Sequence, residues 1–346
     1  FQRVPVMATW LNRQGWIMGL DKLFDHHHRQ VNRKAWGDLR QFYKSLAAAG
    51  QLKTVPQAVS PHLQVTALCR RSLLNNGPAL LFENPQGFDM PVLGNLFGNQ
   101  QRVLAALELD SQRELRELGH EFAFLRNPSL PDSRQSVLDV APGFARLAHI
   151  TPRQKDKAPW QEHVVEGPDV DLGTLPISTC WPEDAGPLIT WGMVVTRGPN
   201  KPRVNLAIYR QQLIGKNKLI MRWLPHRGGA QDLREFQQAH PGKPFPVSVV
   251  IGADPATLLA AVTPIPDTLS EYQFAGLLRG RRSRIVKSGL TGLPIPQGAE
   301  IVLEGHIHPG EMATEGPFAD HTGYYNSTGE FPVFTVDRIC QRDEPV

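Results

Sequence analysis

Short β-branched and apolar runs separated by turn residues fill most of the chain after residue 188, and they constrain its fold more than any other feature. Strands this short and this closely spaced are typical of a β-barrel or a β-sandwich. Two predicted helices, Leu233–His240 and Pro255–Val262, interrupt the series. The second half of the chain is therefore predicted to be a β-rich domain. The runs cover residues 189–197, 204–210, 218–223, 246–251, 284–287, 300–304 and 333–336.

The chain before residue 127 alternates helices with strands, which is the pattern of an α/β domain. Helices are predicted at 38–50, where Asp38 is placed to be the N-cap, at 63–74 and at 111–126, and strands at 79–82 and 91–93. Residues 127–160 are rich in Pro, Ser, Asp and Lys and are predicted to connect two domains. We therefore expect an α+β chain with an N-terminal α/β domain at 34–150 and a β-rich domain, either a barrel or a sandwich, at 151–346.

Residues 1–33 differ from both domains and are predicted to be an N-terminal extension. Apolar residues near helical spacing allow an amphipathic segment that contacts a membrane or a partner protein. A poorly ordered extension is the interpretation that we favour. The histidines of Asp25–Arg29 have no second cluster nearby to complete a metal site, so we expect them at the surface.

The charge and cysteine content argue against several classes of protein. Basic residues exceed acidic residues by only 37 − 33 = 4, without the concentrated stripe of a nucleic-acid-binding protein. The three cysteines show no CxxC spacing, which favours a reducing compartment over a disulfide framework. The sequence also has no apolar run of membrane-spanning length and no signal-peptide pattern. We therefore expect a cytoplasmic protein.

Three side chains suited to a hard or borderline metal fall on separate predicted strands or loops. Asn205, His226 and Glu271 supply an amide oxygen, an imidazole and a carboxylate. Such a set suits Mn²⁺ or Mg²⁺, with phosphate oxygens completing the coordination. On spacing alone, three unrelated surface residues are the commoner explanation.

A second constellation joins Arg210 with two carboxylates, Glu315 and Asp320, which lie five residues apart around a Gly-Pro turn. Near a guanidinium, two such carboxylates titrate as a coupled group, and one of them can become a proton donor near neutral pH. The plainer alternative is an acidic loop in which Asp320 caps a turn. On spacing alone, this alternative is favoured.

Several long strings resemble the UbiD family of decarboxylases, in the same order along the chain. The resemblance covers about residues 35 to 342. It implies an N-terminal α/β domain followed by a flavin-reductase-like split β-barrel. It also implies FMN carrying a prenyl-derived ring, made by a separate flavin prenyltransferase, with a divalent metal such as Mn²⁺. The strings include residues 77–85, 91–98, 176–192, 196–199, 205–229, 252–256, 264–266, 270–271 and 315–323.

The resemblance also implies roles for individual residues. Asn205 and Glu271 would bind the metal that holds the cofactor phosphate, with His226 as the candidate third ligand and Arg227 as its alternative. Arg210, Glu315 and Asp320 would form the catalytic trio, with Asp320 as the proton donor. The residues implied to line the flavin are Ile208, Tyr209, Arg210, Arg222, Trp223, Leu224, Arg227 and Gly228.

The implied reaction is loss of CO₂ from a 4-hydroxybenzoate-type aromatic acid, with or without a polyprenyl tail, in ubiquinone biosynthesis. Such an enzyme is expected to be a homo-oligomer and to contact the inner membrane only peripherally. Family members continue with a further C-terminal domain, so the resemblance implies that this chain lacks that part. Ala319 also stands where close relatives usually have Gly.

Two other functions stay open at this point. The chain can be a catalytically inactive flavin- and metal-binding remnant, or an assembly partner of a full-length decarboxylase. The basic isoelectric point alone suggests a phosphate- or nucleic-acid-binding module. We expect no nucleic-acid partner, because the basic residues are spread along the chain.

Overall fold

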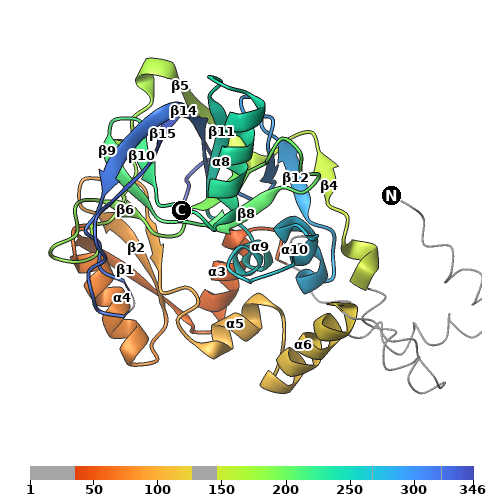
Figure 1. The fold of residues 1–346 in the computed structure, drawn as a ribbon. Coiled ribbons are helices and arrows are strands. Elements are labelled where there is room, and N and C mark those ends of the chain that lie inside the picture. Colours follow the sequence, from red (N-terminus) through yellow and green to blue (C-terminus); the bar gives the residue numbers. More distant parts are fainter. Residues whose placement is uncertain (1–35, 127–145, 267, 321) are drawn as a thin grey trace, which may run out of the picture. The chain divides into compact units, whose positions relative to one another are not determined.

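The N-terminal part of the chain contains a small three-stranded sheet with helices beside it (Figure 1). A computed structural model describes residues 36–126, 146–266, 268–320 and 322–346. The predicted extension at 1–33 and most of the predicted connection lie outside these residues. The elements are α3 (Leu39–Ala48), β1 (Leu52–Val59), α4 (Gln64–Leu74), β2 (Ala79–Pro85), β3 (Val92–Gly94), α5 (Gln100–Ala106) and α6 (Gln112–Arg126).

The small sheet has the order β1-β2-β3, with β1 parallel and β3 antiparallel to β2. This arrangement agrees with the predicted α/β pattern. Asp38 caps α3 as predicted, because its carboxylate accepts a hydrogen bond from the N–H of Gln41 at 2.9 Å. Strand β1 was not predicted, because its Pro56 and exposed polar residues hide the alternation typical of a strand.

The second half of the chain forms a nine-stranded sheet, which confirms the predicted β-rich domain. Its order is β6-β9-β10-β15-β14-β11-β7-β8, with β5 paired to β15. Among the described residues, the end strands β6 and β8 do not pair with each other, so the sheet is not a closed barrel. The strands are β5 (His163–Glu166), β6 (Leu188–Ile189), β7 (Met193–Thr196), β8 (Asn205–Ile208), β9 (Gln211–Gly215), β10 (Lys218–Met221), β11 (Phe245–Ile251), β14 (Ile301–Glu315) and β15 (Gly329–Gln341).

The two longest strands, β14 and β15, extend well beyond the predicted runs at 300–304 and 333–336. They pair with each other from Ile301 and Gln341 to Glu315 and Gly329. Most residues between 308 and 314 are exposed, so no apolar alternation marks this half of β14 in the sequence. The hairpin therefore carries Glu315 at the far end of a long strand.

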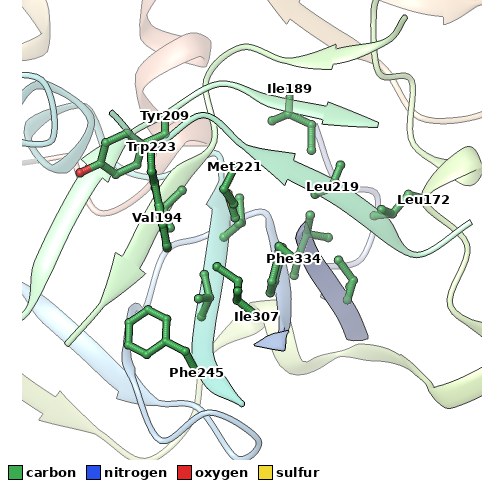
Figure 2. Close-up of a cluster of buried hydrophobic side chains, with 14 of the residues drawn as sticks. Leu172, Ile189, Val194, Tyr209, Leu219, Met221, Trp223, Phe245, Ile307 and Phe334 are labelled. Atoms are coloured by element: carbon green, nitrogen blue, oxygen red, sulfur yellow. The ribbon is translucent and has the colours of Figure 1, made fainter. Parts of the chain in front are cut away.

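Apolar side chains cover both faces of the large sheet. Val194 belongs to one core cluster and its neighbour Val195 to the other, as the alternation of a strand requires. Figure 2 shows the first cluster, in which Phe245 and Phe334 are fully buried. Its labelled residues are Leu172, Ile189, Val194, Tyr209, Leu219, Met221, Trp223, Phe245, Ile307 and Phe334.

Three helices pack against the β-rich part. Helix α8 (Gly228–Ala239) contacts β7, β8 and β11, and it begins five residues before the predicted start. Helices α9 (Pro255–Ala260) and α10 (Glu271–Arg279) pack against each other (Figure 1). The prediction that Glu271 lies on a strand or loop was wrong, since Glu271 is the first residue of α10. The reciprocal capping bonds between Ser270 and Gln273 start the helix there, and a Ser-x-x-Gln pattern is their signal.

A second small sheet has the order β13-β12-β4. Its strands are β13 (Pro294–Pro296), β12 (Arg284–Lys287) and β4 (Arg153–Lys155). Because β4 pairs with β12, the last part of the predicted connection at 127–160 belongs to the β-rich part. No helix in the described parts of the chain is both long and apolar enough to cross a membrane.

A buried carboxylate joins α3, the start of β14 and the segment after β15. Glu300 is fully buried, and Arg40 and Arg342 donate to it at 3.0 and 3.1 Å. Since removing the carboxylate leaves two arginines without their partner, Glu300→Ala should lower the free energy of unfolding by about 3 kcal/mol. Urea denaturation measures this change.

The matched control is Glu117→Ala, which breaks the exposed pair between Glu117 and Arg113 on α6. It should cost less than about 1 kcal/mol, because solvent screens exposed ion pairs. Equal losses in the two variants would contradict the structural role of Glu300.

Candidate active site

Two of the three predicted metal ligands lie close together. Asn205 begins β8, and Glu271 begins α10. The Glu271 carboxylate accepts a hydrogen bond from the N–H of Leu206 at 2.9 Å, which holds it beside the start of β8. Burial raises the pKa of Glu271, opposed by hydrogen bonds from backbone N–H groups. Both side chains are more than nine-tenths buried and provide oxygen atoms, as a hard metal requires.

The N-terminus of α8 lies against Asn205. A Cβ atom added to Gly228 would lie 2.3 Å from Asn205 Oδ1, so only glycine fits at this position without a shift. The side chain of Arg227, the N-cap residue of α8, makes no capping hydrogen bond. A helix N-terminus with free N–H groups attracts an anion such as a phosphate. An amide oxygen, a carboxylate and an anion site therefore lie next to one another.

His226, the predicted third ligand, is exposed on the loop before α8. Its carbonyl oxygen accepts a hydrogen bond from Gln231 Nε2 at 3.0 Å. No contact of its imidazole with Asn205 or Glu271 is found in the described part of the chain. Within those same residues there is also no group of three His, Cys, Asp or Glu side chains that could hold a metal. The structure thus brings two of the three predicted ligands together.

The residues predicted to line the flavin lie on two neighbouring segments. Ile208, Tyr209 and Arg210 lie at the end of β8 and just after it, and Arg222, Trp223 and Leu224 follow β10. The N–H of Arg222 donates to the Arg210 carbonyl at 3.3 Å, and the N–H of Arg227 donates to the Leu224 carbonyl at 2.9 Å. The two segments, which are separate in the sequence, are therefore neighbours in the structure.

The rings of Tyr209 and Trp223 meet edge to face, with centroids 6.0 Å apart. The hydroxyl oxygen of Tyr209 accepts a hydrogen bond from the N–H of Gly229 at 3.2 Å. The indole Nε1 of Trp223 is buried and has no hydrogen-bond partner among the residues that the structure describes. An unpartnered buried donor beside a helix N-terminus fits a ligand that carries acceptor oxygens. The residues present therefore fit a phosphate-bearing cofactor.

Glu315 is the centre of the second predicted constellation. It is fully buried at the end of β14. Arg210 donates to it through Nε at 2.7 Å and Nη2 at 3.0 Å, and Arg222 donates through Nη1 at 2.7 Å. The guanidinium of Arg210 also lies over the ring of Phe318, and that of Arg222 over the ring of Phe331, each at 5.3 Å. Two arginines therefore fix one carboxylate, and the part that Arg222 plays was not predicted.

Asp320 follows on the same turn as Glu315. Its Oδ1 accepts a hydrogen bond from the N–H of Thr322 at 2.8 Å, and its Oδ2 accepts one from Asn326 Nδ2 at 3.2 Å. The turn-capping alternative thus describes part of what Asp320 does. The hydrogen bonds described for Asp320 fix it within its own loop, whereas Arg210 and Glu315 bond directly to each other.

The position of this turn depends on a residue that the sequence analysis missed. Asp184 accepts hydrogen bonds through Oδ2 from the N–H groups of Cys180 and Trp181 at 3.2 and 2.9 Å. Its Oδ1 accepts a hydrogen bond from the N–H of Ala319 at 3.0 Å. The N–H of Ala185 also donates to the carbonyl of Pro317 at 3.0 Å. Asp184 therefore links the loop at 180–185 to the residue just before Asp320.

Two segments of the chain match known protein families. Residues 152–346 match the 3-octaprenyl-4-hydroxybenzoate carboxy-lyase Rift-related domain. Residues 43–122 match the 3-octaprenyl-4-hydroxybenzoate carboxy-lyase N-terminal domain. The chain belongs to the UbiD family. Since the two matched segments cover most of the described UbiD-family chain, the α+β architecture is that of the family.

Solved UbiD-class structures resemble the chain over 90% of its length. An evolved dimeric HmfF from Pelotomaculum thermopropionicum, in complex with prFMN, is 29% identical, with a TM-score of 0.76. The vanillic acid decarboxylase of Sedimentibacter hydroxybenzoicus in its closed form is also 29% identical, with a TM-score of 0.79. The UbiD-family chain spans 66% and 63% of these two chains, respectively.

The close approach of Gly228 to Asn205 leads to a prediction. If FMN and Mn²⁺ bind beside Asn205, Gly228→Ala should weaken the binding of both by about tenfold or more, because the added methyl group displaces the Asn205 amide. Flavin fluorescence quenching and Mn²⁺ electron paramagnetic resonance measure the two affinities.

Gly119→Ala on α6 is the matched control, because nothing lies within 4 Å of the Cβ that it adds. It should leave both affinities unchanged. Unchanged affinities in Gly228→Ala as well would show that neither ligand binds beside Asn205.

Proposed function

We propose that this chain carries out the non-oxidative decarboxylation of a 4-hydroxybenzoate-type aromatic acid with prenylated FMN and a divalent metal such as Mn²⁺. The observation that carries the proposal is the buried Glu315, held by Arg210 and Arg222 next to the predicted flavin-lining segments. Family membership supports it, and a similar UbiD-class enzyme has been solved with prFMN bound.

The cofactor would be held from the N-terminus of α8. Asn205 and Glu271 would bind the metal, and the N–H groups at the start of α8 would face the cofactor phosphate. His226 stays the proposed third ligand. When bound, the prenylated flavin supplies an electron sink for the charge left on the ring as CO₂ departs. The part played by this chain is to orient the substrate, exclude water and deliver a proton.

Arg210 is suited to orient the substrate carboxylate. Its Nε and Nη2 atoms are engaged by Glu315, and no protein partner of Nη1 is found in the described residues. Nη1 therefore has two N–H groups with which to hold a carboxylate. Glu315 fixes the plane of the guanidinium, so that this hold is aligned before the substrate binds.

Asp320 is the proposed proton donor. As the bond between the ring carbon and CO₂ breaks, the proton of the Asp320 carboxylic acid would form the new C–H bond at that carbon. The hydrogen bonds from Thr322 and Asn326 would then stabilise the carboxylate that remains. Arg210, Glu315 and Asp320 would thus divide orientation and proton transfer among them.

The proposed substrate also has consequences for where and with which partners the protein works. A polyprenyl tail on the acid would place the reaction in ubiquinone biosynthesis and the protein in the cytoplasm, at the surface of the inner membrane. A flavin prenyltransferase would supply the cofactor, and the working form would be a homo-oligomer. Since one similar structure is a vanillic acid decarboxylase, small methoxylated acids belong in the substrate panel too.

The test is CO₂ release by the chain co-expressed with a flavin prenyltransferase and supplied with Mn²⁺. The panel contains 4-hydroxybenzoate, a 3-prenylated analogue and vanillate. We expect one CO₂ for each decarboxylated phenol from at least one acid. A bound flavin spectrum without CO₂ release would overturn the proposal in favour of an inactive binding protein or an assembly partner.

A further inference from the structure

A chain of buried hydrogen bonds leads away from the predicted metal ligand Asn205. Thr196 ends β7 and is the direct cross-strand neighbour of Asn205. Asn205 Nδ2 donates to Thr196 Oγ1 at 3.1 Å, and Thr196 Oγ1 donates to Asp232 Oδ2 on α8 at 2.7 Å. The exposed fractions of Thr196, Asn205 and Asp232 are 0%, 5% and 1%. Water therefore does not compete for these bonds.

The direction of each hydrogen bond follows from the chemistry of the groups. The Asp232 carboxylate offers only acceptors, and Lys201 Nζ donates to its other oxygen at 3.0 Å. The single hydroxyl proton of Thr196 is therefore used on Asp232, and only lone pairs of Oγ1 face Asn205. A lone pair can be satisfied by the amide Nδ2 but not by the amide Oδ1. The reversed amide would place two acceptor oxygens against each other.

With Nδ2 bonded to Thr196, the amide oxygen Oδ1 points in the opposite direction. Asn205 Oδ1 lies 2.3 Å from the position of a Cβ atom on Gly228, so it faces the start of α8. Glu271 provides the second oxygen near the start of β8. A cation binds an amide through oxygen and is repelled by the amide hydrogens. The orientation of this one amide thus decides whether a metal can bind.

We propose that Asp232 and Thr196 are positioning residues that hold the Asn205 amide with its oxygen toward the metal. This inference rests on the proposed metal-dependent function. The two residues touch neither the metal nor the substrate. They select one of two amide orientations that are nearly equal in shape, because the hydroxyl proton of Thr196 is already committed to Asp232.

The first test measures Mn²⁺ affinity, in the presence of saturating FMN, by electron paramagnetic resonance. Thr196→Val keeps the shape of the side chain and removes the hydroxyl group. It should weaken Mn²⁺ binding by about 10- to 100-fold. The Asn205→Asp variant carries a carboxylate at this position, which presents an oxygen to the metal whichever way the group is turned. In that variant, Thr196→Val should change the affinity by less than about threefold.

The control is Thr257→Val, which breaks the same kind of bonds elsewhere. Thr257 is 1% exposed, donates to Asp254 at 2.7 Å and accepts from Arg279 Nη2 at 2.9 Å. We expect no change in Mn²⁺ affinity. An equal loss on Thr196→Val in the wild-type and Asn205→Asp backgrounds would mean a merely structural effect, and would overturn the inference.

The second test needs no metal. In metal-free protein labelled with [¹⁵N]asparagine, the Nδ2 protons of Asn205 should exchange slowly with solvent. Thr196→Val should speed this exchange at least about tenfold, and Thr257→Val should not. Fast exchange in the wild type would overturn the hydrogen-bond chain itself. Slow exchange without Mn²⁺ binding in any variant would instead refute the metal function, and with it the role inferred for the chain.

Discussion

Glu315→Gln is expected to reduce the rate of CO₂ release by about 10²- to 10⁴-fold, the range for loss of a positioned catalytic group. Glu315 is fully buried and accepts three hydrogen bonds from Arg210 and Arg222. A glutamine offers one acceptor oxygen, and its NH₂ group cannot bond a guanidinium. One arginine would therefore lose its partner, and Arg210 its alignment. Single-turnover kinetics on an acid that the unmodified chain decarboxylates measure the loss.

The matched variant is Glu311→Gln on the same strand. Glu311 pairs with Lys218 near the exposed half of β14, away from both arginines. This change should alter the rate by less than about threefold, since an exposed pair contributes little. If the two variants were equally active, Glu315 would have no part in the reaction. Urea denaturation of Glu315→Gln separates a catalytic loss from unfolding.

Glu271→Gln is expected to weaken Mn²⁺ binding by at least about 100-fold, because second-sphere changes alone cost up to that factor. The substitution keeps the size of the side chain and an oxygen that can accept from the N–H of Leu206. What it removes is the negative charge that a divalent cation requires. Titration with Mn²⁺ in the presence of FMN measures the affinity.

Glu304→Gln provides the comparison for Glu271. Glu304 is also fully buried in the large sheet, but it pairs with Arg338 on β15. Its substitution should cost stability and leave the Mn²⁺ affinity of the folded protein unchanged. A similar loss of affinity in both variants would mean that buried charge in general, and not a ligand at Glu271, controls metal binding.

Much of the architecture follows from patterns that are local in the sequence. The capping position of Asp38 predicted the start of α3, and the β-branched run at 284–287 predicted β12 with the bounds that it has. The long strings shared with the UbiD family named Arg210 and Glu315 as partners, and the fold brings them together. The helix cap and the strand run are predictable because their patterns lie within single short segments. The pair of Arg210 and Glu315, which are 105 positions apart, was predicted only through the family resemblance.

What was missed depends on contacts between distant parts of the chain. The exposed half of β14 is a strand only because β15 pairs with it, and no apolar pattern marks it. Nothing in the sequence distinguishes Asp184 and Asp232 from other acidic residues. Their structural roles depend on hydrogen bonds from an N–H group 135 positions away and from a hydroxyl group 36 positions away, respectively. Such partners become visible only once the chain is folded.

The link through Asp184 connects the acid-bearing turn to the small N-terminal sheet. The loop at 180–185 is held from its other side, because the guanidinium of Arg70 on α4 lies 6.0 Å from the ring of Trp181 and the N–H of Leu63 donates to Thr179. Leu63 and α4 thus contact the loop that holds the turn bearing Asp320. We expect chimeras that exchange residues 52–85 between family members to carry part of their substrate tolerance with them, even though the proposed catalytic residues Arg210, Glu315 and Asp320 stay behind.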